Sequence, residues 1–331
     1  MAHIELERVC KTFRVTRKQK GLAGAVKGLF RPDRREVHAV RDVSFAIEPG
    51  ELVGFIGPNG AGRSTTIKML SGILYPTSGS VSVVGLSPQE KRRAVAQRIG
   101  AVFGQRSQLN WDLRLGESYE LFKRIYRITD DDFERSLAEL CEVLGIEDLL
   151  DTPVRQMPLG QRMRGELAGA MLHEPDILFL DDPTMGMDME VKAAIRAFIR
   201  DINQRRRTTV LLTTHDLDDV EELCERLIIN QGRIIEDGPL AALIDSITPH
   251  RYLIVECDPG AGEPLAGFAH AHAEILERRD SIVRIRFARS QVSASALISE
   301  LSARYPVRDV SVQEPDIEDV IRTVYRRDVG E

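Results

Sequence analysis

The chain has 331 residues, of which 43% are hydrophobic and 29% charged, and its formal net charge at pH 7 is −6. This length and this balance describe a folded protein with one large domain and a smaller one, and they exclude a disordered chain. The negative net charge gives no general attraction to nucleic acid or to an anionic membrane.

The cysteines and the apolar runs indicate a cytoplasmic protein. Four cysteines are scattered along the chain without a CxxC pair, which predicts buried thiols in a reducing compartment: Cys10, Cys141, Cys224 and Cys257. No apolar run approaches the ~18 residues of a membrane span, and the start MAHIELERVCK lacks the apolar core of a signal peptide. We expect any membrane contact to be made through a partner.

A basic segment, residues 14–35, interrupts the first predicted strands. The stretch IELERVCKTFRV before it predicts a strand, and the segment itself carries eight Lys or Arg against one acid. Its apolar residues recur at helical spacing: Leu22, Val26, Leu29 and Phe30. We expect a short amphipathic helix here. Two interpretations remain open, a solvated surface excursion and contact with lipid head groups or a membrane partner.

A glycine-rich turn then follows a buried strand. VHAVRDVSFAIEPGELVGFIG becomes a continuous apolar run, the turn GPNGAGRST comes next, and STTIKMLSGIL predicts a helix. Strand, turn and helix in this order are the context of a phosphate-binding loop. The backbone N–H groups of Gly60, Gly62, Arg63 and Ser64 are expected to converge on a β-phosphate at the positive end of the helix.

The turn departs from the phosphate-loop pattern GxxxxGK[ST] at one position. Ser64 stands at the Mg²⁺-binding hydroxyl, with Thr65 as a second hydroxyl, but Arg63 replaces the lysine. Arginine keeps the positive charge, yet its guanidinium is larger, planar and forked, so it does not simply replace a compact ammonium. A glycine-rich turn without a ligand is the alternative for this stretch taken alone.

Helices and parallel strands follow. From 116 to 170 the sequence is helical, with a predicted cap at Thr129 and Asp132 and a stop at Gly145. PDILFLDDPT and RTTVLLTTHD are short, apolar and β-branched, which is typical of parallel strands, and ligands of such sheets lie beyond the strands' carboxyl ends. The composition changes at Pro249 and His250, and the residues after 240 suggest a small α+β domain. Its role stays open between dimerisation, regulation and a clasp over the rest of the chain.

The polar residues that end these two strands suit phosphate chemistry. Asp181 is placed to hold Mg²⁺ through water, Asp182 to orient the attacking water, and His215 to donate to a γ-phosphate. Each has a structural alternative, because paired acids after a strand are often a helix cap and a lone histidine is often structural.

Together, and in this order, these segments resemble the ATP-binding cassette (ABC) ATPases over roughly residues 3 to 240. The resemblance implies an α/β P-loop NTPase fold, with a RecA-like core, a helical subdomain at about 106–172 and a cassette over 1–240, followed by a small α+β domain over 241–331. It also implies ATP and Mg²⁺ as ligands.

The motifs of that family map onto individual residues here. Walker A corresponds to Gly57, Pro58, Asn59, Gly60, Ala61, Gly62, Arg63, Ser64 and Thr65, and the signature motif to Met157, Pro158, Leu159, Gly160 and Gln161. Gln105 matches the Q-loop, which would add a Mg²⁺ ligand beside Ser64 and Asp181 and contact the membrane subunit. Asp181 matches Walker B, Asp182 the catalytic glutamate, Asp188 the D-loop and His215 the switch histidine. Phe13 lies where an aromatic ring stacks on adenine, although as a strand residue it could equally belong to the core.

Within the family the chain looks most like the ATPase of bacterial type-2 (ABC-2) exporters, through VFGQRSQLNWDL, LGQRMRGELAGAMLHEP and EPDIEDVIRTVYRR. That likeness implies two cassettes, a homodimer more than a heterodimer, peripheral on the inner face of the membrane under separate transmembrane permeases. It implies export of a drug, antibiotic, lipid or polysaccharide. No nucleic-acid partner is expected.

Three departures bear on the rate of hydrolysis. Asp182 in place of glutamate retracts the carboxylate by about one C–C bond, ~1.5 Å, and a misplacement of ~1 Å can cost on the order of a hundredfold in rate. Pro158 removes a hydroxyl and an N–H of the signature, and Arg63 is the third departure. Two hypotheses follow, a sluggish ATPase subunit of an exporter and a regulatory cassette that binds ATP with little turnover.

Overall fold

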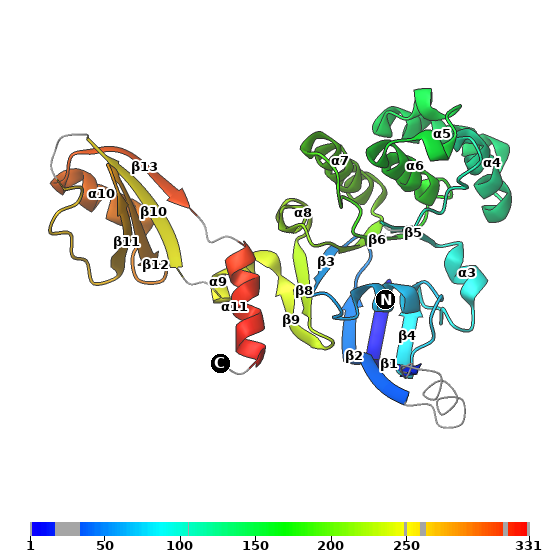
Figure 1. Cartoon of the computed structure of the whole chain (residues 1–331), viewed down its shortest axis with the longest axis horizontal. Coiled ribbons are helices and arrows are strands. Elements are labelled where there is room, and N and C mark those ends of the chain that lie inside the picture. Colours follow the sequence, from blue (N-terminus) through cyan, green and yellow to red (C-terminus); the bar gives the residue numbers. More distant parts are fainter. Residues whose placement is uncertain are drawn as a thin grey trace, which may run out of the picture. The chain divides into compact units, whose positions relative to one another are not determined.

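The computed structural model describes residues 2–16, 34–104, 106–247, 250–258, 263–313 and 317–329. The chain forms two compact units, Met1–Gly238 and Pro239–Glu331 (Figure 1). Within the described ranges, no helix combines the length and the apolar character that crossing a membrane requires.

A six-stranded sheet forms the centre of the first unit. Its order is β5-β6-β7-β3-β8-β9, and β5 to β8 pair in parallel along this order. The strands are β3 (Leu52–Ile56), β5 (Ile99–Phe103), β6 (Ile177–Asp181), β7 (Thr209–Thr213), β8 (Arg226–Asn230) and β9 (Ile234–Pro239). The runs predicted as buried parallel strands are β3, β6 and β7, and nearly all their residues are buried.

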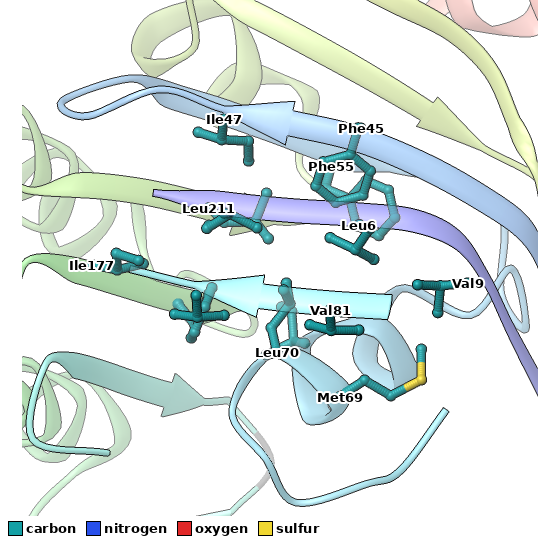
Figure 2. Packing of buried hydrophobic residues seen from close by; sticks show 14 of the residues in the cluster. Leu6, Val9, Phe45, Ile47, Phe55, Met69, Leu70, Val81, Ile177 and Leu211 are labelled. Atoms are coloured by element: carbon teal, nitrogen blue, oxygen red, sulfur yellow. The ribbon is translucent and has the colours of Figure 1, made fainter. Parts of the chain in front are cut away.

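A second, antiparallel sheet packs near the phosphate loop. It has the order β2-β1-β4, with β1 (Ile4–Thr16), β2 (Arg34–Ile47) and β4 (Ser78–Val83). Its apolar side chains share one core with the central sheet and with α2 (Arg63–Leu70), as Figure 2 shows for Leu6, Val81, Phe55 and Leu70. The rings of Phe45 and Phe55 lie 5.6 Å apart between centroids. This core fixes the helix that follows the glycine-rich turn.

The predicted helix in the basic segment lies mostly outside the described residues. Only the ends of that segment, 14–16 and 34–35, are described, and both belong to strands. Arg14 pairs with Glu36 in the antiparallel register of β1 and β2, and their side chains form an exposed ion pair at 3.2 Å. The strands β1 and β2 therefore include residues 14–16 and 34–35 of this segment.

Among the remaining helices of the first unit, α5 begins and ends at the predicted signals. Thr129 caps α5 by accepting a 3.2 Å hydrogen bond from the Asp132 amide, and Gly145 ends that helix with φ +60°. The helices are α3 (Arg92–Ala96), α4 (Leu115–Tyr126), α5 (Asp130–Leu144), α6 (Leu159–Met171), α7 (Met189–Arg206) and α8 (Leu217–Leu223), with 3₁₀ turns at Glu147–Leu149 and Val154–Gln156.

The second unit is an antiparallel sheet in the order β11-β12-β10-β13 with a separate helix pair. Its elements are α9 (Leu240–Ile247), β10 (His250–Cys257), β11 (Ala273–Arg279), β12 (Ile282–Ala288), α10 (Ala294–Arg304), β13 (Val307–Gln313) and α11 (Ile317–Val329). Alternate residues of β10 and β12 are buried against Leu297 and Leu301 of α10, and α9 packs against α11.

Candidate functional site

The glycine-rich turn is fixed from behind by the protein. Gly60 and Gly62 have φ of +86° and +89°, and a Cβ on Gly62 would lie 2.2 Å from the Ala39 carbonyl oxygen. Asn230, which is fully buried at the end of β8, donates a 2.7 Å hydrogen bond to the Ala61 carbonyl oxygen. The turn is therefore held in place by contacts within the protein.

The donors that this turn presents are free to bind an anion. In the described part of the chain, the amides of Gly60, Gly62, Arg63 and Ser64 donate no hydrogen bond, whereas the Thr66 amide already bonds the Gly62 carbonyl oxygen at 2.8 Å. These amides lie at the start of α2, where the helix dipole is positive. The arrangement suits a phosphate group.

Hard oxygen ligands meet beside the turn. Asp181 ends β6 and pairs in register with Thr213, the last residue of β7. Ser64 Oγ donates to Asp181 Oδ1 at 3.1 Å, and Thr213 Oγ1 donates to the same oxygen at 2.5 Å. Hydroxyl and carboxylate oxygens are ligands that Mg²⁺ accepts, and it usually keeps waters and phosphate oxygens in its remaining positions. Ser64 and Asp181 therefore fit a magnesium site.

A cavity of ≈ 200 Å³ opens at this point. It is lined by Ser64, Lys68, Ile73, Phe103, Gly104, Arg106, Asp181 and Asp182. Gln105, the predicted Q-loop residue, lies outside the described residues, but its two chain neighbours line the cavity. The cavity thus lies at the carboxyl ends of β5 and β6, the edge of the sheet at which the sequence predicts a ligand.

The side chain of Arg63 faces His215, the predicted switch histidine. It is only 7% exposed, Nη1 donates to the Thr214 carbonyl oxygen at 2.9 Å, and Nη2 lies 2.8 Å from Nε2 of His215. The guanidinium is thus bound to protein groups that follow β7.

Asp182 is held beside His215. Its Oδ1 accepts a 3.0 Å hydrogen bond from the His215 amide, and its Oδ2 lies 3.6 Å from Nε2 of the same residue. Burial raises the pKa of the Asp182 carboxyl, while the nearby guanidinium of Arg63 acts to lower it. The φ of Asp182 is +55°, a left-handed conformation that aspartate tolerates better than most residues.

A buried polar group that the sequence reasoning missed supports this loop. Asp219 of α8 is fully buried and accepts hydrogen bonds from the hydroxyls of Thr184 and Thr214, the latter at 3.1 Å. Arg196 of α7 donates to the same carboxylate at 2.6 Å. In the sequence, the only signal is that Asp219 stands next to the apolar Val220 in a short helix. A carboxylate that is buried beside such a residue needs hydrogen-bond partners.

The residues predicted as signature and D-loop lie at the starts of two helices, α6 and α7. Pro158 is the N-cap of α6, one residue before the first helical position, with Met157 buried and Leu159 exposed. Asp188 caps α7 by accepting from the Val191 amide at 2.9 Å. Among the described residues, no hydrogen bond or ion pair joins the signature to Ser64 or Asp181.

The adenine candidate stands apart from the core. Phe13 lies in β1, is half-buried, and has the Lys11 ammonium 5.3 Å from its ring centroid. It is not a member of the apolar cluster shared by the two sheets and α2.

Comparisons with known proteins identify the family of this chain. The ABC transporter family model matches residues 40–185. NatA of Bacillus subtilis, an ABC transporter ATP-binding protein, is 34% identical over 218 residues, which cover 66% of this chain and 88% of NatA. The chain is a member of the ABC transporter ATP-binding family.

Two further relatives differ in what their names say. The Nod factor export ATP-binding protein I of Burkholderia orbicola is 36% identical over 208 residues, covering 62% of this chain and 68% of that protein. The methionine import ATP-binding protein MetN of Latilactobacillus sakei is 30% identical over 304 residues, covering 88% and 86%.

A solved cassette extends the match to three dimensions. A dimeric ATP-binding cassette in a post-hydrolysis state, bound to ADP and Pi, superimposes with a TM-score of 0.59 at 25% identity, over 72% of this chain and 98% of that chain. The predicted α/β P-loop cassette is confirmed. The protein is an ATP-binding ATPase subunit of an ABC transporter.

Proposed function

We propose that this ABC protein drives an ABC-2 type exporter as one of two identical cassettes beneath separate membrane permeases. The export assignment is supported by the 36% identity to a Nod factor export protein and by the ABC-2 phrases of the sequence. The MetN relative is matched over more of its length but at lower identity. The dimeric cassette of the same fold supports pairing of two copies.

The roles that we propose for the chain's own residues follow from their contacts. The free amides of Gly60, Gly62 and Ser64 would hold the phosphates, and Asp182 would accept the proton of the attacking water. Bound Mg²⁺, held by Ser64 and Asp181 with Gln105 as a third ligand, would neutralise charge on the phosphates. His215 would donate to the γ-phosphate, and Phe13 would stack on adenine.

We further propose that each site takes its Walker residues from one cassette and its signature, Met157 to Gln161, from the other. Asp188 would lie at this junction as part of the D-loop. Because both sites of a homodimer carry Arg63, Asp182 and Pro158, turnover would be slow in each. ATP would close the pair, and hydrolysis would reopen it.

We also propose separate roles for the two parts of the chain. Residues 1–240 would be the nucleotide-binding cassette, with the helical subdomain at 106–172 facing the permease near Gln105. Residues 241–331 would form a separate α+β domain that supports dimerisation. Deletion of 241–331 is expected to weaken self-association in sedimentation, and an unchanged monomer–dimer balance would contradict that role.

The location of the protein follows from its partners. It would lie on the cytoplasmic face of the cell membrane, bound to permeases rather than inserted. We expect a tagged chain, crosslinked in cells, to recover an ABC-2 type permease identified by mass spectrometry. Recovery of an importer's permease would contradict the export assignment.

The observation that carries the proposed mechanism is the meeting of Ser64, Asp181 and Asp182 around one cavity. The test is steady-state Mg-ATP hydrolysis, with ATP binding measured alongside, for the native chain and for the triple variant Arg63→Lys, Pro158→Ser, Asp182→Glu. We expect both to bind ATP, and the variant to hydrolyse it at least about tenfold faster, since ~1 Å of misplacement costs more than that. Equal rates would show that these three residues do not limit turnover.

A further inference from the structure

The contact between Arg63 and the residues after β7 joins two parts of the site that are far apart in the sequence. One edge of the guanidinium, formed by Nη1 and Nη2, faces the Thr214 carbonyl oxygen at 2.9 Å and the His215 ring at 2.8 Å. These partners lie 151 and 152 positions along the chain from Arg63. Such a two-point contact suits a planar fork and not the compact ammonium of lysine.

The segment that Arg63 holds, residues 214–216, is here called the switch segment. It is bound on its other side by the protein interior, because Thr214 Oγ1 donates to the buried carboxylate of Asp219 and accepts from the Asp216 amide at 2.9 Å. The His215 amide in turn donates to Asp182. Arg63 therefore connects the phosphate loop to the switch segment and, through that segment, to Asp182.

The same guanidinium is needed elsewhere when a nucleotide is present. Arg63 is the first residue of α2, beside amides that donate no hydrogen bond within the described chain. A phosphate bound to those amides attracts the nearest cation, and arginine binds phosphate best through the paired donors of one edge. The Nη1/Nη2 edge is already used by Thr214 and His215. A phosphate that binds through this edge therefore competes with the switch segment for it.

We propose that Arg63 restrains the switch segment in the nucleotide-free site and releases it when phosphate takes the guanidinium. This inference rests on the proposed nucleotide site and adds a regulatory role to one of its residues. Nucleotide binding then works against the Arg63–His215 contact, so affinity is lower than the phosphate loop alone would give. His215 becomes free to turn to the γ-phosphate only after a nucleotide has bound.

The test is a double-mutant cycle on ADP affinity, because ADP lacks the γ-phosphate that His215 is proposed to bind. Kd for ADP is measured by calorimetry for the native chain, His215→Ala, Arg63→Lys and the double variant. A hydrogen bond to a charged group corresponds to about a 10- to 100-fold effect on an equilibrium constant. We expect His215→Ala to tighten ADP binding by that factor in the native background and to leave it unchanged in the Arg63→Lys background.

Two further variants distinguish a restraint by Arg63 from a non-specific effect of mutation on ADP affinity. His215→Gln keeps an acceptor for the guanidinium, so its ADP Kd should stay close to the native value. Asp218→Ala removes an exposed side chain of α8 close to the same loop and should change nothing in either background. Melting temperatures measured for every variant identify any loss of folding.

The outcomes distinguish the proposed restraint by Arg63 from the proposed nucleotide site on which it rests. If His215→Ala leaves the ADP Kd unchanged or raises it in the native background, the restraint is overturned. An equal gain in ADP affinity in the native and Arg63→Lys backgrounds would overturn it as well. If every folded variant, including Arg63→Lys, failed to bind ADP and ATP, the proposed nucleotide site itself would be wrong. Binding by all variants without coupling would overturn the restraint alone.

Discussion

Asp181 and Thr213 are paired residues at the ends of the parallel strands β6 and β7, and the Thr213 hydroxyl donates a 2.5 Å hydrogen bond to Asp181 Oδ1. Because the register of the two strands is fixed here, the residues that follow are aligned as well. Asp182 and His215 meet directly after the pair, with the His215 amide bound to Asp182 Oδ1. The position of the catalytic candidates thus depends on strand pairing inside the sheet.

Replacing Asp182 by glutamate should raise activity and lower stability together. The extra methylene moves the carboxylate outward, and hydrolysis is expected to rise about tenfold, since small changes in position weigh heavily on rate. The φ of +55° suits aspartate better than glutamate, so unfolding should become easier by about 1 kcal/mol.

Steady-state hydrolysis and urea unfolding of Asp182→Glu measure both effects. Asp182→Asn is the matched control, with hydrolysis lowered by about 10²-fold or more through loss of the base and ATP binding retained. A rate for Asp182→Asn equal to that of the native chain would remove Asp182 from the chemistry.

Asp219→Asn should destabilise the chain by about 2 kcal/mol, because it removes the buried partner of Arg196, which keeps ion pairs only with the more exposed Asp216 and Glu222. The two hydroxyls that Asp219 accepts from would also lose part of their acceptor, so the switch segment should loosen and hydrolysis should fall. Chemical unfolding measures the first effect. Asp218→Asn, the exposed neighbour on the same helix, is expected to change neither stability nor rate.

Stability should fall in mild acid through His173. Burial lowers the pKa of His173 to about 4, its Nε2–H donates to the Ile99 carbonyl oxygen at 3.0 Å, and its ring stacks on Tyr126. The unfolded chain, with an ordinary histidine pKa near 6.5, binds the proton first as pH falls. The contribution of His173 is therefore complete above about pH 6.5 and declines toward pH 4, with about 2 kcal/mol lost at pH 5.

Urea unfolding of the native chain and of His173→Gln at pH 7.5 and pH 5 isolates this term. Glutamine does not titrate, so the drop in unfolding free energy between the two pH values should be smaller in the variant by about 2 kcal/mol. The same pH dependence in both proteins would mean that the His173 ring is not held neutral by the fold.

Alanine at Gly60 and at Gly62 should have different consequences, although both glycines have positive φ. A Cβ at Gly60 meets no atom within 4 Å, so Gly60→Ala should cost about 1–2 kcal/mol of backbone strain and keep ATP binding. A Cβ at Gly62 would lie 2.2 Å from the Ala39 carbonyl oxygen and 2.9 Å from Val40, so Gly62→Ala must displace the turn.

Calorimetric titration with ATP and melting temperature test this pair. Gly62→Ala should lose measurable ATP binding and melt well below Gly60→Ala. Similar behaviour of the two variants would show that the turn adjusts freely and that its shape is not fixed by β2.

Much of the fold followed from local patterns in the sequence. The apolar runs before residue 57 and around Asp181 predict buried parallel strands, Thr129 and Gly145 mark the ends of a helix, and the glycine spacing predicts a turn able to bind phosphate. These features depend on neighbouring residues alone, so a single sequence suffices to predict them. Because parallel strands end on one edge of a sheet, the meeting of Ser64, Asp181 and Asp182 was predictable too.

The tertiary structure decided what the local patterns leave open. Arg63 binds Thr214 and His215, Asn230 supports the turn from β8, and Asp219 gathers Arg196 with two threonines. Each contact joins segments distant in the sequence, and its partner is chosen by how sheets and helices pack. Sequence spacing carries no measure of that packing, so it identified Arg63 as a departure from the pattern while only the fold revealed which groups its guanidinium holds.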